Sequence, residues 1–276
     1  MRILLYSLFL FAIHLILIGC TTSETPTSVF SSIDSLTIDS IYQQHGVTGS
    51  LVLYDQTQDT YQTYHAERTQ QGYIAASTFK IINALIALED SIVADENEMF
   101  PWDSVERSVE VWNQDHNLRS GLKYSVVWLY QRIARQVGEE RYRKWLTEAY
   151  YGNHNPGGGV DMFWLNGDLR ISPMQQIDFL RRLYHNELPF SQRSLDIVKD
   201  IMIYEQTDQY TIRAKTGWSD AFTPGVGWFV GYLETNGNVY FFANQLDIRH
   251  NEDIQARAQI VKDVFEKSGL LSLSAM

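Results

Sequence analysis

The sequence predicts an α+β fold in which an antiparallel sheet is built from both ends of the chain and a helical lobe is inserted between them. Strand-like segments lie near residues 47–65 and again near 209–246 of the 276 residues, with helical periodicity between them. The hydrophobic content of 45% supports a sizeable core. Strands and helices that are separated along the chain in this way are typical of α+β proteins.

The first twenty residues read as a targeting segment rather than as part of the fold. Arg2 precedes an apolar stretch, Ile3–Ile18, which ends in Leu17-Ile18-Gly19-Cys20 and resembles a bacterial lipobox. We expect a lipoprotein signal peptide at 1–19, lipidation of Cys20, a Thr/Ser-rich tether at 20–30 and one catalytic domain at 31–276. The protein would then be exported and anchored facing the periplasm. A plain signal peptide with an incidental cysteine, or a short transmembrane anchor, is the alternative.

The sequence of the N-terminal part of the domain predicts a pair of strands followed by a buried helix. Val47–Tyr54 and Thr60–His65 are rich in β-branched and aromatic residues, as paired strands are. Phe79–Leu88 is an apolar run with no polar face apart from Lys80 and Asn83, which indicates a helix surrounded by protein.

The middle of the chain, Val105–Ile203, is predicted to be mostly helical. Lys123–Gln136 and Pro173–Tyr184 repeat apolar residues with the helical period. A lobe of this kind beside a sheet leaves a cleft between the two, which is where we expect the binding site.

The C-terminal part returns to strands and ends in a helix. Gln209–Lys215 is one strand, and Gly227–Leu233 and Val239–Leu246 flank Asn236-Gly237, a strong hairpin signal. Asp253–Lys267 is amphipathic and is predicted to be the last helix.

Charge and composition argue against several classes of function. The net charge is −11 and the pI is about 5.0, without a basic stripe, so a nucleic-acid partner is not expected. The seven histidines form no H-x-H or H-E-x-x-H pattern, so no metal site is expected. The only cysteine is Cys20, which excludes an internal disulfide.

Ser77 and Lys80 carry the first chemical signal. Residues three apart at a helix start share one face, so the lysine lies beside the serine hydroxyl. A hydroxyl, an adjacent base and free helix N–H groups are the equipment of a serine acyltransferase that uses lysine in place of histidine. The alternative is an N-capping serine and a lysine that extends from the helix edge to water.

The same S-x-x-K spacing recurs in Ser120-Gly121-Leu122-Lys123, so spacing alone does not decide. Ser77 is followed by an apolar helix, whereas Ser120 follows the polar run 113–119. This difference favours the first pair.

Lys215-Thr216-Gly217, followed by Trp218, is the second signal. On a strand beside the Ser77 helix, a lysine, a hydroxyl and a glycine would bind an extended acyl substrate that carries a carboxylate. Lys267-Ser268-Gly269 has a similar pattern but follows a helix, where a C-terminal cap explains it.

Taken in order, these motifs resemble those of class D (oxacillinase-type) serine β-lactamases over nearly the whole mature chain. The motifs are Ser77-Thr78-Phe79-Lys80, Ser125-Val126-Val127, Tyr151-Gly152-Asn153 and Lys215-Thr216-Gly217. Blocks at 112–116, 163–167 and 171–173 add to the resemblance. One departure is Gly121-Leu122, where the family more often has Ala-Met, and we expect only local repacking from it.

The resemblance implies a penicillin-binding transferase/β-lactamase-like fold and hydrolysis of β-lactams through an acyl-enzyme on Ser77. It implies that Lys80 is an N-carboxylated general base held by the Trp164 indole, with carbon dioxide as the only co-reactant and no other cofactor. Ser125 would relay a proton, and the backbone N–H groups of Ser77 and Trp218 would form the oxyanion hole. Substrate binding would fall to the following residues: Lys215, Thr216, Gly217, Arg257, Val127, Leu165 and Tyr151.

Other functions remain open at this stage. A penicillin-binding transpeptidase or carboxypeptidase would acylate readily and deacylate slowly. A receptor-type antibiotic sensor would acylate without turnover, and a structural lipoprotein would make the motifs coincidental. The sequence leaves the oligomeric state and the range of β-lactam substrates undetermined.

Overall fold

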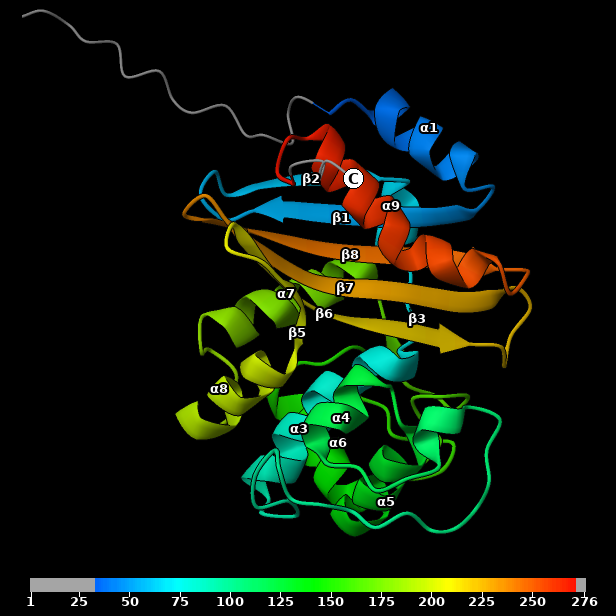
Figure 1. Ribbon diagram of the computed structural model, residues 1–276, viewed down its shortest axis with the longest axis vertical. Helices are drawn as coiled ribbons and strands as arrows, with labels where there is room; N and C mark the ends of the chain where they lie inside the picture. The colour runs from blue at the N-terminus through cyan, green and yellow to red at the C-terminus, as the bar shows by residue number, and fades with distance from the viewer. Residues whose placement is uncertain (1–32, 272–276) are drawn as a thin grey trace, which may run out of the picture.

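A six-stranded antiparallel sheet forms the centre of the computed structural model, which describes residues 33–271 (Figure 1). The strand order is β2-β1-β8-β7-β6-β5, so strands from the two ends of the chain lie side by side, with β1 paired to β8. This arrangement confirms the predicted α+β fold and the sheet built from both termini. The strands are β1 (Thr48–Asp55), β2 (Thr60–Tyr64), β5 (Ile203–Gln206), β6 (Tyr210–Ser219), β7 (Gly225–Thr235) and β8 (Asn238–Ile248).

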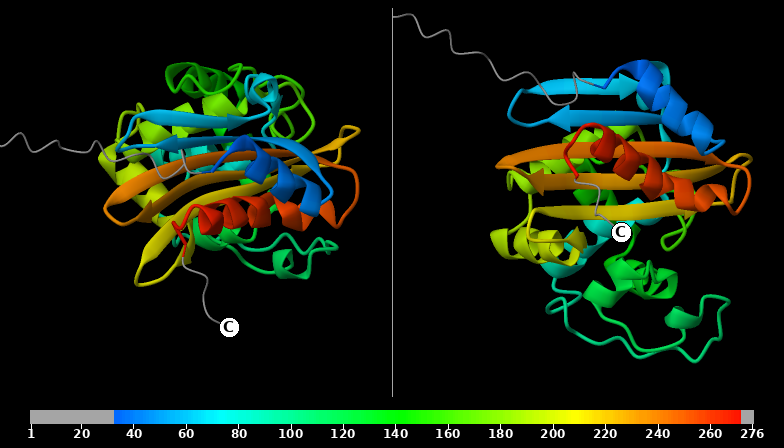
Figure 2. Two further views of the ribbon diagram at one scale, coloured as in Figure 1. Left: turned by 90° about the horizontal axis from the view of Figure 1, so that it is seen from above. Right: turned by 45° about the horizontal axis from the view of Figure 1, so that its top comes forward.

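Each face of the sheet has its own core. The helices α1 (Ser35–Gln44) and α9 (Asp253–Lys267) cover one face, as Figures 1 and 2 show. The other face packs against the helical lobe and continues into its core. The lobe contains α3 (Lys80–Glu89), α4 (Leu118–Lys123), α5 (Val127–Val137), α6 (Glu139–Glu148), α7 (Pro173–Tyr184) and α8 (Gln192–Ile201).

The helix α3 lies at the centre of the lobe because it is apolar on every side. All residues from Lys80 to Leu88 are buried, which a helix can sustain only when other elements surround it. Three short elements lie between β2 and α3 along the chain: α2 (Ala66–Thr69), β3 (Tyr73–Ile74) and η2 (Ala76–Phe79). β4 (Arg170–Ile171) lies between α6 and α7 and pairs with β3, and η3 (Glu110–Trp112) belongs to the long segment before α4.

The predicted single helix Lys123–Gln136 is wrong. Two helices, α4 and α5, meet at Ser125, which has φ +55°. The Ser125 N–H donates to Leu122 O at 3.3 Å and the Val126 N–H donates to Gly121 O at 2.9 Å. These are the two bonds of a Schellman motif, in which the left-handed position usually holds glycine. The chain therefore places a serine in a strained backbone position, a feature that concentrates at functional sites.

The other boundaries follow the predictions closely, with two differences. The strand β6 continues through Thr216 and Gly217 to Ser219 instead of ending at Lys215 as predicted, because these residues also pair with β7. The helix α1 and the short strand β5 had no counterpart in the sequence analysis. Within residues 33–271, every helix is too short or too polar to cross a bilayer.

Candidate active site

Ser77 and Lys80 lie together where η2 runs into α3. The Lys80 Nζ donates a hydrogen bond to Ser77 Oγ at 2.8 Å. Lys80 is fully buried, whereas Ser77 keeps 8% of its surface exposed. The serine therefore remains accessible while the base behind it is shielded from water.

The turn that presents Ser77 is held by neighbours on both sides. Ala76 has φ +49°, and its N–H donates to the carbonyl of Trp164 at 2.7 Å. The Thr78 hydroxyl donates to Ala75 O at 2.7 Å and accepts from Gln176 Nε2 at 2.9 Å. Because these contacts fix the backbone before and after the serine, its hydroxyl has little freedom to move away from Lys80.

Burial lowers the pKa of Lys80 from 10.5 to about 7. The cause is the loss of water around the ammonium group, which favours the neutral amine. The ring of Tyr130 lies 5.5 Å from Nζ, and no carboxylate within the described residues forms an ion pair with it. An amine that is neutral near pH 7 can accept a proton or react as a nucleophile.

Trp164 packs against Phe79, the residue that precedes Lys80, and has an unused donor. Its ring stacks on Phe79 with 5.0 Å between centroids, and the residue is fully buried. Among the described residues, nothing accepts a hydrogen bond from its Nε1. A buried donor without a partner costs about 1–3 kcal/mol, so this pocket favours a group that brings an acceptor.

Ser125 and Lys215 form a second serine–lysine pair, between the lobe and the sheet. The Lys215 Nζ donates to Ser125 Oγ, and also to Thr216 O at 3.0 Å. Burial holds the pKa of Lys215 well below its usual range, and the nearby charges of Lys80 and Arg257 lower it further. The sheet and the lobe thus each contribute one half of this pair, which lies where the sequence analysis expects the site.

Gly217 brings the sheet close to the nucleophile turn. A Cβ atom on this residue would lie 3.2 Å from Thr78 Cγ2, so only glycine lets β6 approach η2 without displacement. Trp218 follows it with 40% of its surface exposed. The backbone of residues 217–218 therefore runs beside that of residues 77–78, where the oxyanion hole is predicted.

Arg257 reaches the same strand from α9. Its Nη1 donates to Gly217 O at 2.6 Å and its Nε donates to Ile254 O at 2.6 Å. Partial burial lowers its pKa to about 10. A Cβ on Gly227 would lie 3.0 Å from Arg257 Cδ, so that glycine makes room for the side chain to cross the sheet.

Comparisons with known proteins agree with this geometry. A family model, the penicillin-binding protein transpeptidase domain, matches residues 46–266. β-Lactamase OXA-48 of Klebsiella pneumoniae is 44% identical over 83% of this chain and 87% of its own length. The probable β-lactamase YbxI of Bacillus subtilis is 41% identical over 81% of this chain and 82% of its own. This chain belongs to the class D β-lactamase family.

Solved structures of the class D family share the fold as well. A class D β-lactamase from Nostoc has a TM-score of 0.83 at 46% identity, covering 85% of this chain and 99% of that one. A class D enzyme from Fusobacterium nucleatum has a TM-score of 0.83 at 37% identity, covering 86% and 99%. The predicted penicillin-binding/β-lactamase-like fold is therefore confirmed.

Tyr151 is the one predicted substrate contact of this class D chain that the structure contradicts. Its side chain is fully buried and packs edge-on against Phe179 and Phe79, at 5.0 and 6.1 Å between centroids. Its motif has a structural role instead. The Asn153 side chain donates to Asp168 O at 2.9 Å and accepts from the Arg170 N–H at 3.0 Å, which anchors the segment that follows Trp164.

Val127 and Leu165 are half-buried, and Leu165 packs against the core of the lobe. The Ser219 hydroxyl donates to Leu165 O at 2.8 Å, which ties the end of β6 to the loop that carries Trp164. The contacts of Val127 and Leu165 with a substrate stay predictions.

The sequence analysis missed Tyr130, Gln176 and Ser219, each of which touches the site or its supports. Tyr130 follows Val127 by three residues on α5, so helical spacing was a usable signal for it. The other two meet the site only through the tertiary fold. Within residues 33–271, no group of three or more His, Cys, Asp or Glu side chains is placed to hold a metal ion.

Proposed function

We propose that this protein hydrolyses β-lactam antibiotics, and thereby confers resistance, through an acyl-enzyme on Ser77 with N-carboxylated Lys80 as the general base. The observation that carries this proposal is the fully buried Lys80 amine, with a pKa near 7, placed 2.8 Å from Ser77 Oγ. The relatives named above are described as β-lactamases, which supports the same activity.

The surroundings of Lys80 fit the carboxylated form. The neutral amine is nucleophilic and adds carbon dioxide, which supplies a carboxylate-like base in place of an ammonium. The orphaned Trp164 Nε1 offers a hydrogen bond to that group. The same indole is held in place by its stacking on Phe79.

The reaction then divides into two steps. Ser77 gives its proton to the base at Lys80, its Oγ bonds to the lactam carbonyl carbon, and the C–N bond breaks. Ser125 passes a proton to the leaving nitrogen, and Lys215 restores it because its Nζ already donates to Ser125 Oγ. Before the second step the base at Lys80 releases the proton from Ser77 to solvent, and Lys215 regains its own proton from solvent. Water then gives a proton to the base and attacks the ester carbonyl, the C–O bond to Ser77 breaks, and the base returns that proton to Ser77 Oγ.

The sheet edge holds the substrate while this happens. The N–H groups of Ser77 and Trp218 are proposed to stabilise the oxyanion. The substrate carboxylate is proposed to lie against the Thr216 hydroxyl and Arg257, whose guanidinium matches a carboxylate in shape. Lys215 adds positive charge only to the extent that it is protonated.

The test is turnover of a chromogenic cephalosporin by the purified protein, with and without added bicarbonate. We expect repeated turnover and a higher rate with bicarbonate, because carbon dioxide completes the base. A single burst that stops at one acyl group per protein would instead indicate a transpeptidase or a sensor. A rate that ignores bicarbonate in degassed buffer would remove carboxylation from the proposal.

We further propose that Cys20 carries a lipid that anchors the exported protein at a bacterial membrane. Cys20 lies outside the described residues, so support comes from the lipobox-like sequence alone. We expect the parent protein to partition into the detergent phase and the Cys20→Ser variant to remain in the aqueous phase. Equal partitioning of the two would refute the anchor.

A further inference from the structure

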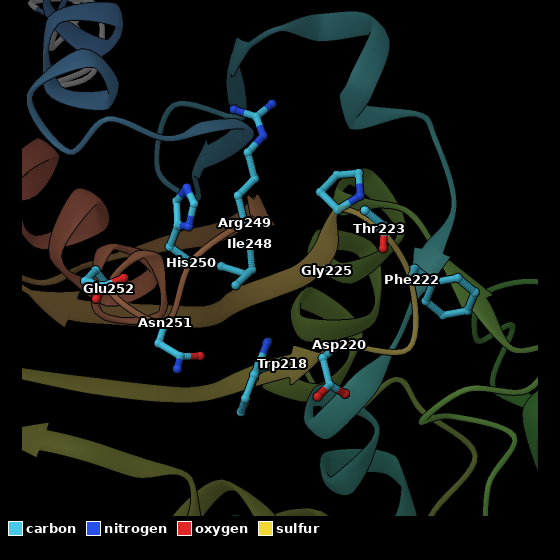
Figure 3. A pocket seen from close by; sticks show the side chains of 11 residues that line it. Trp218, Asp220, Phe222, Thr223, Gly225, Ile248, Arg249, His250, Asn251 and Glu252 are labelled. Carbon is cyan, nitrogen blue, oxygen red and sulfur yellow. The ribbon is translucent and has the colours of Figure 1, made fainter.

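A cavity of about 670 Å³ adjoins the active site beyond Trp218. It lies between the loop that joins β6 to β7 and the segment that joins β8 to α9 (Figure 3). Figure 3 shows Trp218 and Asp220 next to each other on the β6 side, with His250, Asn251 and Glu252 across from them.

The cavity continues the line along which a bound β-lactam would extend. Arg257 contacts Gly217 O, the residue just before Trp218, so the proposed carboxylate position is one residue from the cavity wall. In cephalosporins the lactam carbonyl carbon is bonded on one side to the ring nitrogen, whose neighbour bears the carboxylate, and on the other side to the carbon that bears the acylamino side chain. A substrate with its carboxylate at Thr216 and Arg257 and its lactam carbonyl at the proposed oxyanion hole of Trp218 therefore directs its acyl side chain past Trp218.

The wall at this point combines an open aromatic face with a free negative charge. Trp218 is 40% exposed, and no cation of the described chain lies over its ring. Asp220 is exposed, and within residues 33–271 its carboxylate has no ion pair or hydrogen bond. An indole beside a carboxylate is a favourable site for an organic cation, since the ring face and the charge both attract it.

The other charged and aromatic groups of the cavity are differently placed. Phe222 already has the Arg170 guanidinium over its ring, at 5.2 Å. The Arg249 guanidinium extends away from Trp218 in Figure 3 and lies 3.9 Å from Asp247. His250 and Glu252 lie across the cavity from Trp218. The Arg257 guanidinium donates to Gly217 O and Ile254 O and, in the proposed complex, is paired with the substrate carboxylate. Asp220 is therefore the charge next to Trp218 that is left to attract a cation.

We infer that Trp218 and Asp220 form a subsite for a positively charged substituent of the β-lactam, so that this protein favours substrates that carry one. This inference rests on the proposed function and narrows it to a substrate class. The favourable energy comes from the ring face and from one exposed carboxylate, so we expect a modest preference rather than an absolute one.

The test compares two cephalosporins that share an acetoxymethyl group at C3 and differ in the acyl side chain, phenylacetyl in one and 4-(aminomethyl)phenylacetyl, which carries an ammonium group, in the other. The measurement is the second-order rate constant for opening of the β-lactam ring, followed by absorbance. In the Asp220→Asn variant we expect this constant to fall about three- to fivefold for the aminomethyl compound, and to stay within about 1.5-fold for the phenylacetyl compound. Asp220→Lys should enlarge the difference.

The control is Asp208→Asn, which makes the same change of net charge in the exposed turn between β5 and β6. This variant should leave the ratio of the two rate constants unchanged. Equal effects of Asp220→Asn on both compounds, or an equal shift of the ratio by Asp208→Asn, would overturn the subsite while ring opening itself upheld the proposed function. If the parent protein opened neither ring, the proposed function and the subsite would both fall.

Discussion

Two segments of this chain share the S-x-x-K spacing but lie in opposite environments, one buried and one exposed. Ser77 and Lys80 lie at the start of a helix that is buried on every side, with the lysine fully buried. Ser120 and Lys123 lie on α4, where Ser120 completes a capping box with Asn117 and Lys123 is exposed. The same two side chains at the same spacing therefore form a reactive pair in one place and a helix cap in the other.

The difference shows that the environment, not the spacing, makes the chemistry. Desolvation lowers the pKa of Lys80 to about 7, because nothing in the lobe pairs with its charge. Lys123 is exposed to water, with its Nζ 5.4 Å from the ring centroid of Tyr124. Ser120 Oγ is occupied by the Asn117 N–H at 3.1 Å, whereas Ser77 Oγ accepts from the base itself.

Removing each serine gives the largest expected contrast. Ser77→Ala deletes the atom that bonds to the substrate, so we expect kcat to fall by about 10⁴-fold or more. Ser120→Ala loses part of a helix cap, which lowers the free energy of unfolding by about 1 kcal/mol and leaves kcat within about twofold. Steady-state turnover of a cephalosporin and urea denaturation measure the two effects. A fully active Ser77→Ala protein would disprove the assignment of the nucleophile.

Replacing each lysine distinguishes the Ser77–Lys80 pair from the Ser120–Lys123 pair at the hydrolysis of the acyl-enzyme. Lys80→Ala leaves the serine but no base to activate water, so we expect turnover to fall about 10³-fold and the acyl-enzyme to accumulate. Mass spectrometry of the intact protein after mixing with a penicillin detects the added mass. Lys123→Ala is the matched control and should turn over normally, without a trapped adduct. Normal turnover by Lys80→Ala would exclude the lysine from the mechanism.

The sequence predicted the elements of this fold well wherever the periodicity was strong. The helices α7 and α9 begin and end at the predicted residues, because their apolar faces and end signals agree. The break between α4 and α5 was not predictable from propensity. Ser125 adopts a left-handed backbone conformation there, which serine does not prefer by itself. The reason for it is found only in the folded chain, where Ser125 contacts Lys215.

The site divides in the same way between local and tertiary signals. Ser77, Lys80 and Lys215 follow from motifs in which neighbours along the chain carry the chemistry. The positions of Gln176 and Ser219 depend on contacts between segments 98 and 54 residues apart, which no local pattern encodes. Tyr151 shows the opposite error, because its place in a family motif suggested a surface role for a side chain that the lobe buries.

The pH dependence of activity is the next test of the comparison, with an expected change in kcat/KM of about tenfold. Below pH 7 the ammonium form of Lys80 dominates, and this form neither accepts a proton nor adds carbon dioxide. At limiting bicarbonate we expect kcat/KM to fall about tenfold from pH 8 to pH 6, as the neutral fraction falls. The Lys123→Ala variant should follow the same profile. A flat profile down to pH 5 would show that Lys80 does not titrate in this range.

The smallest expected effect concerns stability. Replacing Lys80 lowers activity but is expected to raise the free energy of unfolding. Lys80 is protonated up to about pH 10.5 when the chain is unfolded and only up to about pH 7 when it is folded. The unfolded chain therefore binds more protons between these values, so this group makes the free energy of unfolding rise with pH across that window and leaves its full cost in place below pH 7. Lys80→Met removes the buried amine while keeping an apolar chain of similar length, so at pH 7 we expect a stabilisation of about 1–2 kcal/mol, or about 2–8 °C in Tm. Lys123→Met, on the exposed pair, should change Tm by less than about 1 °C. Because a residue kept for reactivity is expected to cost stability, a Lys80→Met protein that melts below the parent would show that this amine stabilises the fold instead.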